Sequence, residues 1–471
     1  GSNGQMSRYP FACISHDNFG LALGIDMGMP CQWRLGYSTG TRLFYLSLDF
    51  GLSPLTKNFP SQANFQMVMY AIDPQWSFRS AAERYYQIFP DYFAVRSPDQ
   101  GIWMPFTDVS TVQGWQDFGF KYHEGNNNVP FDDSANVLSF RYSEPSTWWM
   151  NMDTSIPRTY AAAMEQVQTY AESSSNSSLQ RNAQALLTSG SFDEQGKYQM
   201  LFRDEPWANG AVFSLNPSPF LPGEYTDASL MWNDSLAERL YGTNSKGVMD
   251  GEYLDSLEGY VTADLNFRTD HFEYATTPLT FTMDAYRPVI YKAFSIYEFT
   301  RYMSEQMHSR GKLLFANGVP YRYSFLCPWL DILGTETNWI SGGSFSPDSV
   351  ETMNYRKTLS GKKPYLFLMN TNFDEMSSAI VELYFQRCLF YGMYPSMFSH
   401  NAAENPYWQN PTLYNRDRPL FVKYQPLIRQ VAEAGWEPVT WIRTNDEKVL
   451  VERYGQLKDD EIFLTVYGMG N

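Results

Sequence analysis

The feature that most constrains the fold is a pattern that begins near residue 100, where short apolar strands start to alternate with helices. This alternation is typical of a parallel sheet with crossover helices. Eight such strands within about 300 residues are the count and length of a (β/α)8 barrel, so the sequence predicts an α/β fold of this kind. The candidate strands are "GIWMPF" from Gly101, "NVLSFRY" from Asn136, "GAVFSLN" from Gly210, "GVMDGEYLD" from Gly247, "KLLFANG" from Lys312, "WLDILGTE" from Trp329, "PYLFLMN" from Pro364 and "GMYPSMF" from Gly392.

Helices separate several of these strands, and they have the sequences "RTYAAAMEQVQTYAES", "FSIYEFTRYMSEQMHSRGK", "SPDSVETMNYRKTL" and "FDEMSSAIVELYFQRCLFYG". A doubly wound open sheet is the second choice, because no glycine-rich phosphate loop follows any of the strands. The segment from Ser256 to Pro288 forms a long insertion between the fourth strand and its helix. Loops of this length in a barrel usually serve the function, so we expect part of the binding site there.

Strand-like segments flank the barrel on both sides. Between residues 10 and 73, short apolar runs such as "GLALGIDM" and "RLFYLSLDF" are separated by Gly, Pro and Ser turns. A connector helix follows and stops before Pro90. After His400 come a short helix, "PLIRQVAEAG", and three strand-like runs. We therefore predict an N-terminal β-sandwich module with its connector helix over residues 1–95, the barrel over 96–403 and a small C-terminal β-module over 404–471.

The composition argues against several classes of protein. A net charge of −16 leaves no basic stripe for phosphates, so nucleic acid is not an expected partner. No apolar stretch approaches the roughly 20 residues that a membrane-spanning helix needs. The cysteines show no metal-ligand spacing and only five histidines are present, so neither a metal nor a cofactor is expected. Aromatic residues make up 17% of the chain, a surplus that suits stacking on sugars as well as packing in a large barrel.

Polar residues at the C-terminal ends of the strands are the first candidates for chemistry, because the active site of a barrel lies there. The fourth strand runs into "YLDSLEGY", which places Asp255 at its mouth, and the sixth ends in Glu336 after an apolar run. Asn317 ends the fifth strand, between them. The second candidate strand ends with Arg141 and Glu144.

Glycoside hydrolysis requires two carboxyl groups that flank the scissile bond, one protonated to assist the leaving group and one ionised to attack or to activate water. Asp255 and Glu336 meet this requirement, and different surroundings would separate their pKa values. We expect Asp255 to be the nucleophile and Glu336 the acid/base. Asp255 could instead cap the turn after its strand, with Asp250 as the nucleophile. Glu336 could instead pair with Arg322 or Arg268.

Two further groups of residues have simpler explanations than catalysis. Asp331 starts the sixth strand and belongs inside or at the base of the barrel. Isolated histidines fit a helix surface or a hydrogen-bonded loop better than a catalytic role. Four acidic residues in the last part of the fourth strand and the loop after it could hold Ca²⁺, although they lack the ligand loop with a central glycine. These are Asp250, Glu252, Asp255 and Glu258.

Substrate binding is expected from residues around the same mouth. In the insertion, Arg268, Asp270 and His271 could hydrogen-bond sugar hydroxyls. Phe272 and Tyr274 could form an aromatic wall. The other candidates for binding or stacking are Asn317, Asp250, Arg141, Trp103, Trp148, Trp149, Trp207 and Trp339.

Several motifs resemble those of uncharacterised bacterial glycoside hydrolases: "YLDSLEGY" after strand four, "FANG" after strand five, "LDILGTE" after strand six, and the C-terminal "AEAGWEPVTWIRT" and "VERYG". Such proteins are distantly similar to the retaining α-glycosidase superfamily, which includes α-galactosidases and endo-α-N-acetylgalactosaminidases. The resemblance spans most of the chain. It implies a strand-four nucleophile, which falls on Asp255, and an acid/base from strand five or six, which points to Glu336. It also implies flanking β-domains, α-linked substrates and an extracellular or periplasmic location.

The principal hypothesis is therefore a glycoside hydrolase that cleaves oligo- or polysaccharides by a two-carboxylate, retaining mechanism. The alternative is a non-catalytic carbohydrate-binding barrel, which would hold Asp255 and Glu336 far apart or turn one of them into the core. A metal-dependent hydrolase or lyase that uses the strand-four cluster is a third hypothesis, and the scarcity of histidine weighs against it. Barrels host many chemistries, so the geometry of the site must decide among the three.

Overall fold

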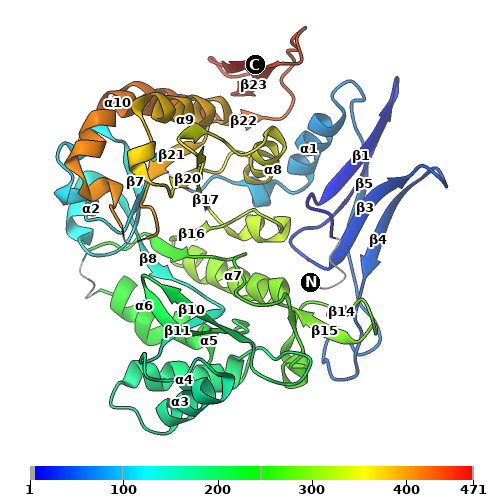
Figure 1. Cartoon of the computed structure of the whole chain (residues 1–471). Coiled ribbons are helices and arrows are strands. Elements are labelled where there is room, and N and C mark those ends of the chain that lie inside the picture. Colours follow the sequence, from blue (N-terminus) through cyan, green and yellow to red (C-terminus); the bar gives the residue numbers. More distant parts are fainter. Residues whose placement is uncertain (1–5, 98, 244, 246, 403, 469–471) are drawn as a thin grey trace.

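A barrel of eight parallel strands forms the centre of the computed structural model, which describes residues 6–97, 99–243, 245, 247–402 and 404–468. The strands neighbour one another in the order of the chain, which confirms the predicted (β/α)8 fold (Figure 1). They are β6 (Ile102–Pro105), β7 (Phe120–Glu124), β8 (Leu138–Ser143), β12 (Gly251–Leu254), β16 (Leu313–Asn317), β17 (Ile332–Thr337), β20 (Tyr365–Met369) and β21 (Tyr394–Met397).

Closure of the barrel brings β21 beside β6. The hydroxyl of Ser396 donates a hydrogen bond to the carbonyl oxygen of Trp103 across this junction. Both residues are fully buried, and a buried polar group without a partner costs about 1–3 kcal/mol. A small polar side chain on the last strand therefore helps to close the sheet on the first.

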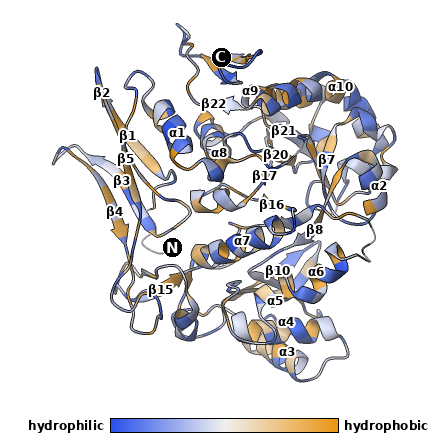
Figure 2. Cartoon of the chain, turned by 180° about the vertical axis from the view of Figure 1, so that it is seen from behind, coloured by the Kyte–Doolittle hydropathy of each residue, from blue (hydrophilic) through white to orange (hydrophobic). Residues whose placement is uncertain are grey.

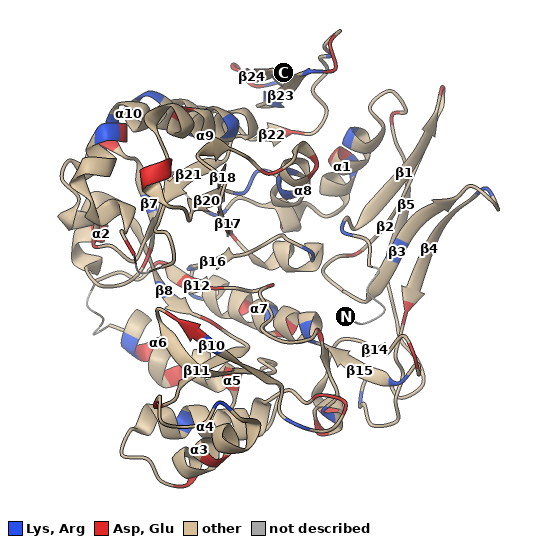
Figure 3. Ribbon diagram, viewed as in Figure 1, with Lys and Arg blue, Asp and Glu red and all other residues tan. Residues whose placement is uncertain are grey.

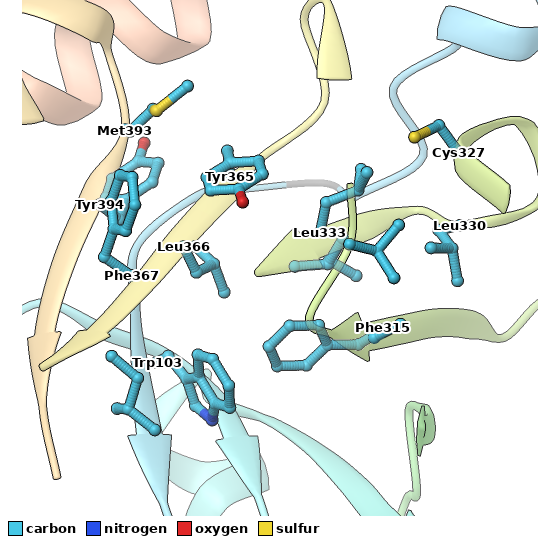
Figure 4. Close-up of a cluster of buried hydrophobic side chains, with 14 of the residues drawn as sticks. Trp103, Phe315, Cys327, Leu330, Leu333, Tyr365, Leu366, Phe367, Met393 and Tyr394 are labelled. Atoms are coloured by element: carbon cyan, nitrogen blue, oxygen red, sulfur yellow. The ribbon is translucent and has the colours of Figure 1, made fainter. Parts of the chain in front are cut away.

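Aromatic side chains fill the barrel. Trp103, Tyr253 and Phe315 are almost completely buried, and Phe315 lies 4.9 Å from each of the other two rings, measured between centroids. Figure 4 shows Trp103 facing Phe315, with Leu333 and Leu366 beside them. The interior is thus a packed core rather than a channel, which leaves the strand ends to carry the chemistry.

Helices cover the outside of the barrel (Figures 1 and 2). Three lie where the sequence predicted them: α7 (Lys292–His308), α8 (Val350–Ser360) and α9 (Ser378–Tyr391). The helix expected from Pro426 is much longer, because α10 (Pro411–Ala434) continues through Pro419 and Pro426. Phe421 and Ile428 are fully buried on its inner face, so packing against the barrel offsets the backbone hydrogen bonds that the prolines remove.

One predicted barrel strand is wrong. "GAVFSLN" forms β11 (Ala208–Ser214), which pairs with β9 (Thr147–Asn151) and β10 (Met200–Glu205) in a separate antiparallel sheet. The true second strand is β7, which the sequence analysis missed. Its Lys121, His123 and Glu124 are buried, and each has a polar partner, so the strand does not read as an apolar run.

The residues between β8 and β12 form an inserted subdomain. One face of its sheet packs on α3 (Tyr160–Glu172) and α4 (Ser177–Ser189) around Trp148 and Phe213. α3 is the helix that the sequence analysis assigned to the barrel. α5 (Asp227–Met231) and α6 (Asp234–Tyr241) lead back to β12. Figures 1 and 2 both place the sheet between β8 and the helices α3 and α4.

The second insertion lies between β12 and α7, as predicted. It contains a small sheet of β13 (Leu265–Asn266), β14 (Thr280–Phe281) and β15 (Pro288–Tyr291), and a 3₁₀ helix, η4 (Thr269–Tyr274). Its strands are too short to be recognised from an apolar pattern.

Small β-sheets flank the barrel on both sides, in agreement with the sequence. At the N-terminal side, β1 (Phe11–His16), β2 (Phe19–Ile25) and β5 (Met67–Ala71) form one sheet, and β3 (Gln32–Ser38) pairs with β4 (Leu43–Asp49). The connector helix is α1 (Ser77–Ile88). At the other side, β22 (Trp436–Glu437), β23 (Val449–Tyr454) and β24 (Phe463–Gly468) form an antiparallel sheet. Among the described residues, no helix is long and apolar enough to cross a membrane.

Replacement of Phe315 by alanine tests the packed interior. We expect a loss of about 3–5 kcal/mol in the free energy of unfolding, because a large buried ring is removed and a cavity remains. Phe19→Ala is the matched control, since Phe19 is 54% exposed, and it should change stability by less than about 0.5 kcal/mol. Urea unfolding followed by circular dichroism measures both. Similar small losses for the two variants would contradict a packed barrel.

Candidate active site

The side chain of Asn317 joins the two predicted catalytic carboxyl groups. Its Nδ2 donates hydrogen bonds to Asp255 Oδ1 at 2.8 Å and to Glu336 Oε1 at 2.6 Å. Its Oδ1 accepts a hydrogen bond from the backbone N–H of Glu336 at 3.2 Å. The three residues come from the ends of the neighbouring strands β12, β16 and β17, so the barrel brings together what the sequence predicted.

The shared amide limits the spacing of the two carboxyl groups. Asp255 Oδ1 and Glu336 Oε1 contact the same nitrogen, so they lie no farther apart than the sum of 2.8 and 2.6 Å. Carboxyl groups of retaining glycosidases lie about 5–5.5 Å apart, and those of inverting enzymes about 6.5–9.5 Å apart. Even at this upper limit, the two nearest oxygens lie closer together than the carboxyl groups of inverting enzymes.

Burial of its carboxyl group and the nearby charge of Asp255 favour the protonated form of Glu336. Its side chain is accessible at the mouth of the barrel, while protein atoms surround most of its carboxyl group. This burial, followed by the negative charge of Asp255, raises the pKa of Glu336 to about 7. Hydrogen bonds from Asn317 and Asn370 oppose the shift. A large share of the molecules therefore carries this proton at neutral pH.

On the other side of Asp255, residues of β8 and its following loop complete the network. The hydroxyl of Tyr142 lies 2.9 Å from Asp255 Oδ2 and 3.3 Å from Glu144 Oε2. The hydroxyl of Tyr253 lies 3.3 Å from Asp255 Oδ1. Together with Asn317, these hydroxyls fix the orientation of the Asp255 carboxylate. Burial, followed by the charge of Asp255, raises the pKa of Glu144 to about 7.

A further carboxyl group, that of Glu124, is almost completely buried beside the pair. Its Oε2 accepts a hydrogen bond from Trp103 Nε1 at 2.9 Å. Burial, followed by the charges of Asp255 and Glu336, raises the pKa of Glu124 well above its usual range. This shift favours the protonated form of Glu124, which carries no negative charge next to Asp255.

Phe106 presents an aromatic face at the same end of the barrel. It follows β6, is 45% exposed and has a φ of +51°, a left-handed conformation that bulky residues rarely adopt. Its ring lies 5.6 Å from that of Tyr142 and 5.7 Å from that of Phe398. Strained backbone of this kind is typical of functional sites. An exposed ring next to the Asp255 network suits contact with a sugar.

Two predicted stacking residues belong to the core. Trp103 is fully buried inside the barrel, and its indole N–H is bonded to Glu124. Trp339 is 1% exposed and packs against Phe367 and Tyr384. Neither ring can stack on a sugar, because both faces contact protein. Their spacing along the chain did not distinguish a packed tryptophan from an exposed one.

Asp250 and Arg141 also lie away from the carboxyl pair. β12 begins at Gly251, so Asp250 precedes the strand and lies at the opposite end of it from Asp255. There its carboxyl group accepts a hydrogen bond from the backbone N–H of Ser139. The alternative that made Asp250 the nucleophile is therefore wrong. Arg141 forms an ion pair with Glu252, since both side chains alternate to the outside of the barrel.

Arg268 and His271 contact the inserted subdomain instead of the carboxyl pair. Arg268 forms an ion pair with Asp270 and donates to the carbonyl of Gly190. His271 is 3% exposed, and its Nε2 lies 3.0 Å from the carbonyl oxygen of Thr188. Burial lowers the pKa of His271 to about 4. Both side chains connect the second insertion to the first. Their contacts therefore do not support a role in substrate binding.

The competing explanations for the acidic residues can also be tested against the contacts. Arg322 pairs with Asp264 and not with Glu336. Asp331 is buried at the start of β17 and bonds to His308, as expected for the base of the barrel. No cluster of His, Cys, Asp or Glu in the described part of the chain could hold a metal ion. The four cysteines are free thiols.

A surface hollow of about 500 Å³ lies at the other end of the barrel, lined in part by Gly101 and Gly119, which precede β6 and β7. Its charged groups are engaged in ion pairs, because Asp99 pairs with both Lys121 and Arg429, and Asp117 pairs with Arg418. The strand ends, in contrast, hold a carboxyl pair without a cationic partner among the described residues. We therefore place the chemistry at the strand ends.

The sequence analysis missed three residues of the site, and the reason differs for each. Asn370 ends the predicted strand "PYLFLMN", so its position at a strand end was a usable signal. Glu124 was hidden because β7 was not recognised as a strand. Tyr142 lies in a predicted strand, but nothing in its local sequence shows that its hydroxyl reaches Asp255.

No protein-family model and no curated protein matches the chain. Among solved structures, α-N-acetylgalactosaminidase NagBb from Bifidobacterium bifidum in complex with GalNAc is similar at 11% identity and a TM-score of 0.47, over 97% of this chain and 73% of that one. A quadruple mutant of the same protein is similar at 11% identity and a TM-score of 0.42, over 89% of this chain and 67% of that one. Likeness at this level does not define a family, so the function is inferred from the geometry of the site.

The Asp255→Asn variant tests the coupling between the two carboxyl groups. Removal of the negative charge should lower the pKa of Glu336 from about 7, because repulsion no longer opposes its ionisation. A pH titration of ¹³C-labelled glutamate carboxyl groups by NMR measures this shift. Asp270→Asn is the control, since Asp270 pairs with Arg268 on the insertion and should leave the Glu336 titration unchanged. An unaltered Glu336 pKa in Asp255→Asn would contradict the coupling.

Proposed function

We propose that the protein is a glycoside hydrolase that acts with retention of configuration. The observation that carries this proposal is the amide of Asn317, which holds one oxygen of Asp255 and one of Glu336 at the same nitrogen. Two carboxyl groups at this spacing, one with a raised pKa, are what double displacement at an anomeric carbon requires. The proposed active site is therefore this carboxyl pair at the strand ends of the barrel.

In the first step, the Asp255 carboxylate attacks the anomeric carbon while Glu336 gives its proton to the glycosidic oxygen. The bond from the anomeric carbon to that oxygen breaks, and the leaving group departs as an alcohol. The sugar is then joined to Asp255 as an ester. Tyr142 and Tyr253 hold the carboxylate in place for this attack.

In the second step, Glu336 has lost its proton and acts as a base. It takes a proton from water, whose oxygen attacks the anomeric carbon, and the ester bond to Asp255 breaks. The hydrogen bonds from Asn317 and Asn370 stabilise Glu336 in its ionised state between the two steps. One water is consumed, and the scheme needs no cofactor.

The substrate is proposed to be an α-linked oligo- or polysaccharide. The α-configuration and an extracellular or periplasmic location are supported by the sequence motifs that resemble retaining α-glycosidases. The exposed ring of Phe106 supports a carbohydrate as the ligand, because sugar faces stack on aromatic rings.

Two substitutions test the catalytic roles on p-nitrophenyl α- and β-glycosides of galactose, N-acetylgalactosamine and glucose. Asp255→Asn should abolish turnover. Glu336→Gln should lower kcat by about 10²–10⁴-fold but release a burst of nitrophenol, because this leaving group needs little acid assistance. Glu305→Gln, on the surface of α7, is the control and should keep wild-type activity. Full activity of Asp255→Asn would contradict the assignment.

The pH dependence of kcat/KM tests the role of Glu336 as the acid. Activity should fall as the pH rises through about 7, because the raised pKa keeps the proton on Glu336 only below that value. Asn370→Ala removes a hydrogen bond that lowers the pKa of Glu336, so the alkaline limb should move to higher pH. A limb that stays in place or moves to lower pH in Asn370→Ala would contradict the role of Asn370.

A further inference from the structure

An aromatic pair, one exposed ring and one half-buried ring, lies on the inserted subdomain. Trp207 occupies the turn between β10 and β11, and its side chain is 52% exposed. Its ring meets that of Trp149, on β9, edge to face at a centroid distance of 5.7 Å and an interplanar angle of 74°. Figure 3 shows acidic residues at the end of β10, where Asp204 and Glu205 come directly before the turn that carries Trp207. Aromatic faces with polar groups at their edges are suited to sugar rings.

Hydrogen bonds connect this pair to the carboxyl groups of the barrel. Trp149 Nε1 donates to Glu144 Oε1 at 3.0 Å, and Glu144 Oε2 lies 3.3 Å from the hydroxyl of Tyr142. The same hydroxyl contacts Asp255 at 2.9 Å. The two tryptophans therefore lie at the edge of the Asp255 network, on the β8 side, whereas Glu336 lies on the β17 side.

The subdomain holds the pair in a fixed position. Successive residues of β9 point to opposite faces of the sheet, so Trp148 is buried against α3 and α4 while Trp149 lies on the other face. β9 follows directly from β8, and its pairing with β11 positions the turn that carries Trp207. The subdomain core thus supports an aromatic surface that the barrel alone does not provide.

We propose that Trp149 and Trp207 form a stacking platform for a second sugar ring of the substrate, next to the ring that lies between Asp255 and Glu336. The proposal rests on the proposed glycosidase function and narrows it to oligosaccharides. The half-buried Trp149 is linked to Asp255 through Glu144 and Tyr142, and it places the exposed ring of Trp207 where a neighbouring ring of a glycan would lie. The enzyme then prefers substrates with at least two rings over single-sugar glycosides.

The test compares three substrates for each enzyme variant. The first is the p-nitrophenyl monoglycoside that the wild type cleaves fastest. The second has the same sugar α-linked to lactose, and the third is the p-nitrophenyl glycoside of a disaccharide of that sugar. Trp207→Ala should lower kcat/KM about tenfold on one of the two extended substrates, and by less than about twofold on the monoglycoside.

A matched control is available on the C-terminal side of the chain. Trp441 is 54% exposed and meets Trp76 edge to face at 5.7 Å, so Trp441→Ala removes an equivalent ring away from the barrel mouth. It should change kcat/KM on none of the three substrates. Trp207→Phe should restore most of the selectivity, because a flat ring is retained.

The outcomes separate this inference from the function on which it rests. A selective loss on either extended substrate supports the platform, and the substrate affected shows on which side of the cleaved bond it lies. An equal loss on all three substrates, or no loss on any, overturns it. Absence of glycosidase activity in the wild-type protein would instead overturn the proposed function.

Discussion

Two carboxyl groups at this spacing repel each other when both are ionised, and the side-chain amide of Asn317 is the contact that holds them together. It has two N–H groups and gives one to each carboxyl group. This contact depends on the register of three strands. Leu254 lies opposite Ala316, so Asp255 follows opposite Asn317, and Asn317 lies opposite Gly334, two residues before Glu336. A shift of one residue would turn one of these side chains to the outside of the barrel.

Several carboxyl groups can lie close together at this site because their different protonation reduces the repulsion between negative charges. Glu124, Glu144 and Glu336 all have raised pKa values, chiefly because protein atoms surround their carboxyl groups, and the charge of Asp255 adds to each shift. These shifts favour the protonated forms of the three glutamates around Asp255. Burial and a neighbouring negative charge thus raise the pKa of Glu336 to about 7, a value that suits the acid/base role proposed for it.

The parts of the fold that could be predicted from the sequence are those whose apolar pattern reports burial directly. Seven of the eight predicted barrel strands lie where expected, as do Asp255, Asn317 and Glu336, because a strand end can be located from the run before it. β7 was missed because its buried polar residues find partners only in the folded barrel. Trp103 and Arg268 were placed at the mouth wrongly, since the direction of a side chain depends on strand alternation and on contacts with segments distant in the sequence.

Trapping of the glycosyl-enzyme tests the central claim most directly. The protein would be incubated with a fluorinated glycosyl fluoride of the sugar that it cleaves, digested, and analysed by mass spectrometry. The geometry predicts one sugar adduct on the peptide that contains Asp255, and no adduct in the Asp255→Asn variant. An adduct on another residue, or hydrolysis that releases the inverted anomer without any adduct, would contradict a retaining mechanism with Asp255 as the nucleophile.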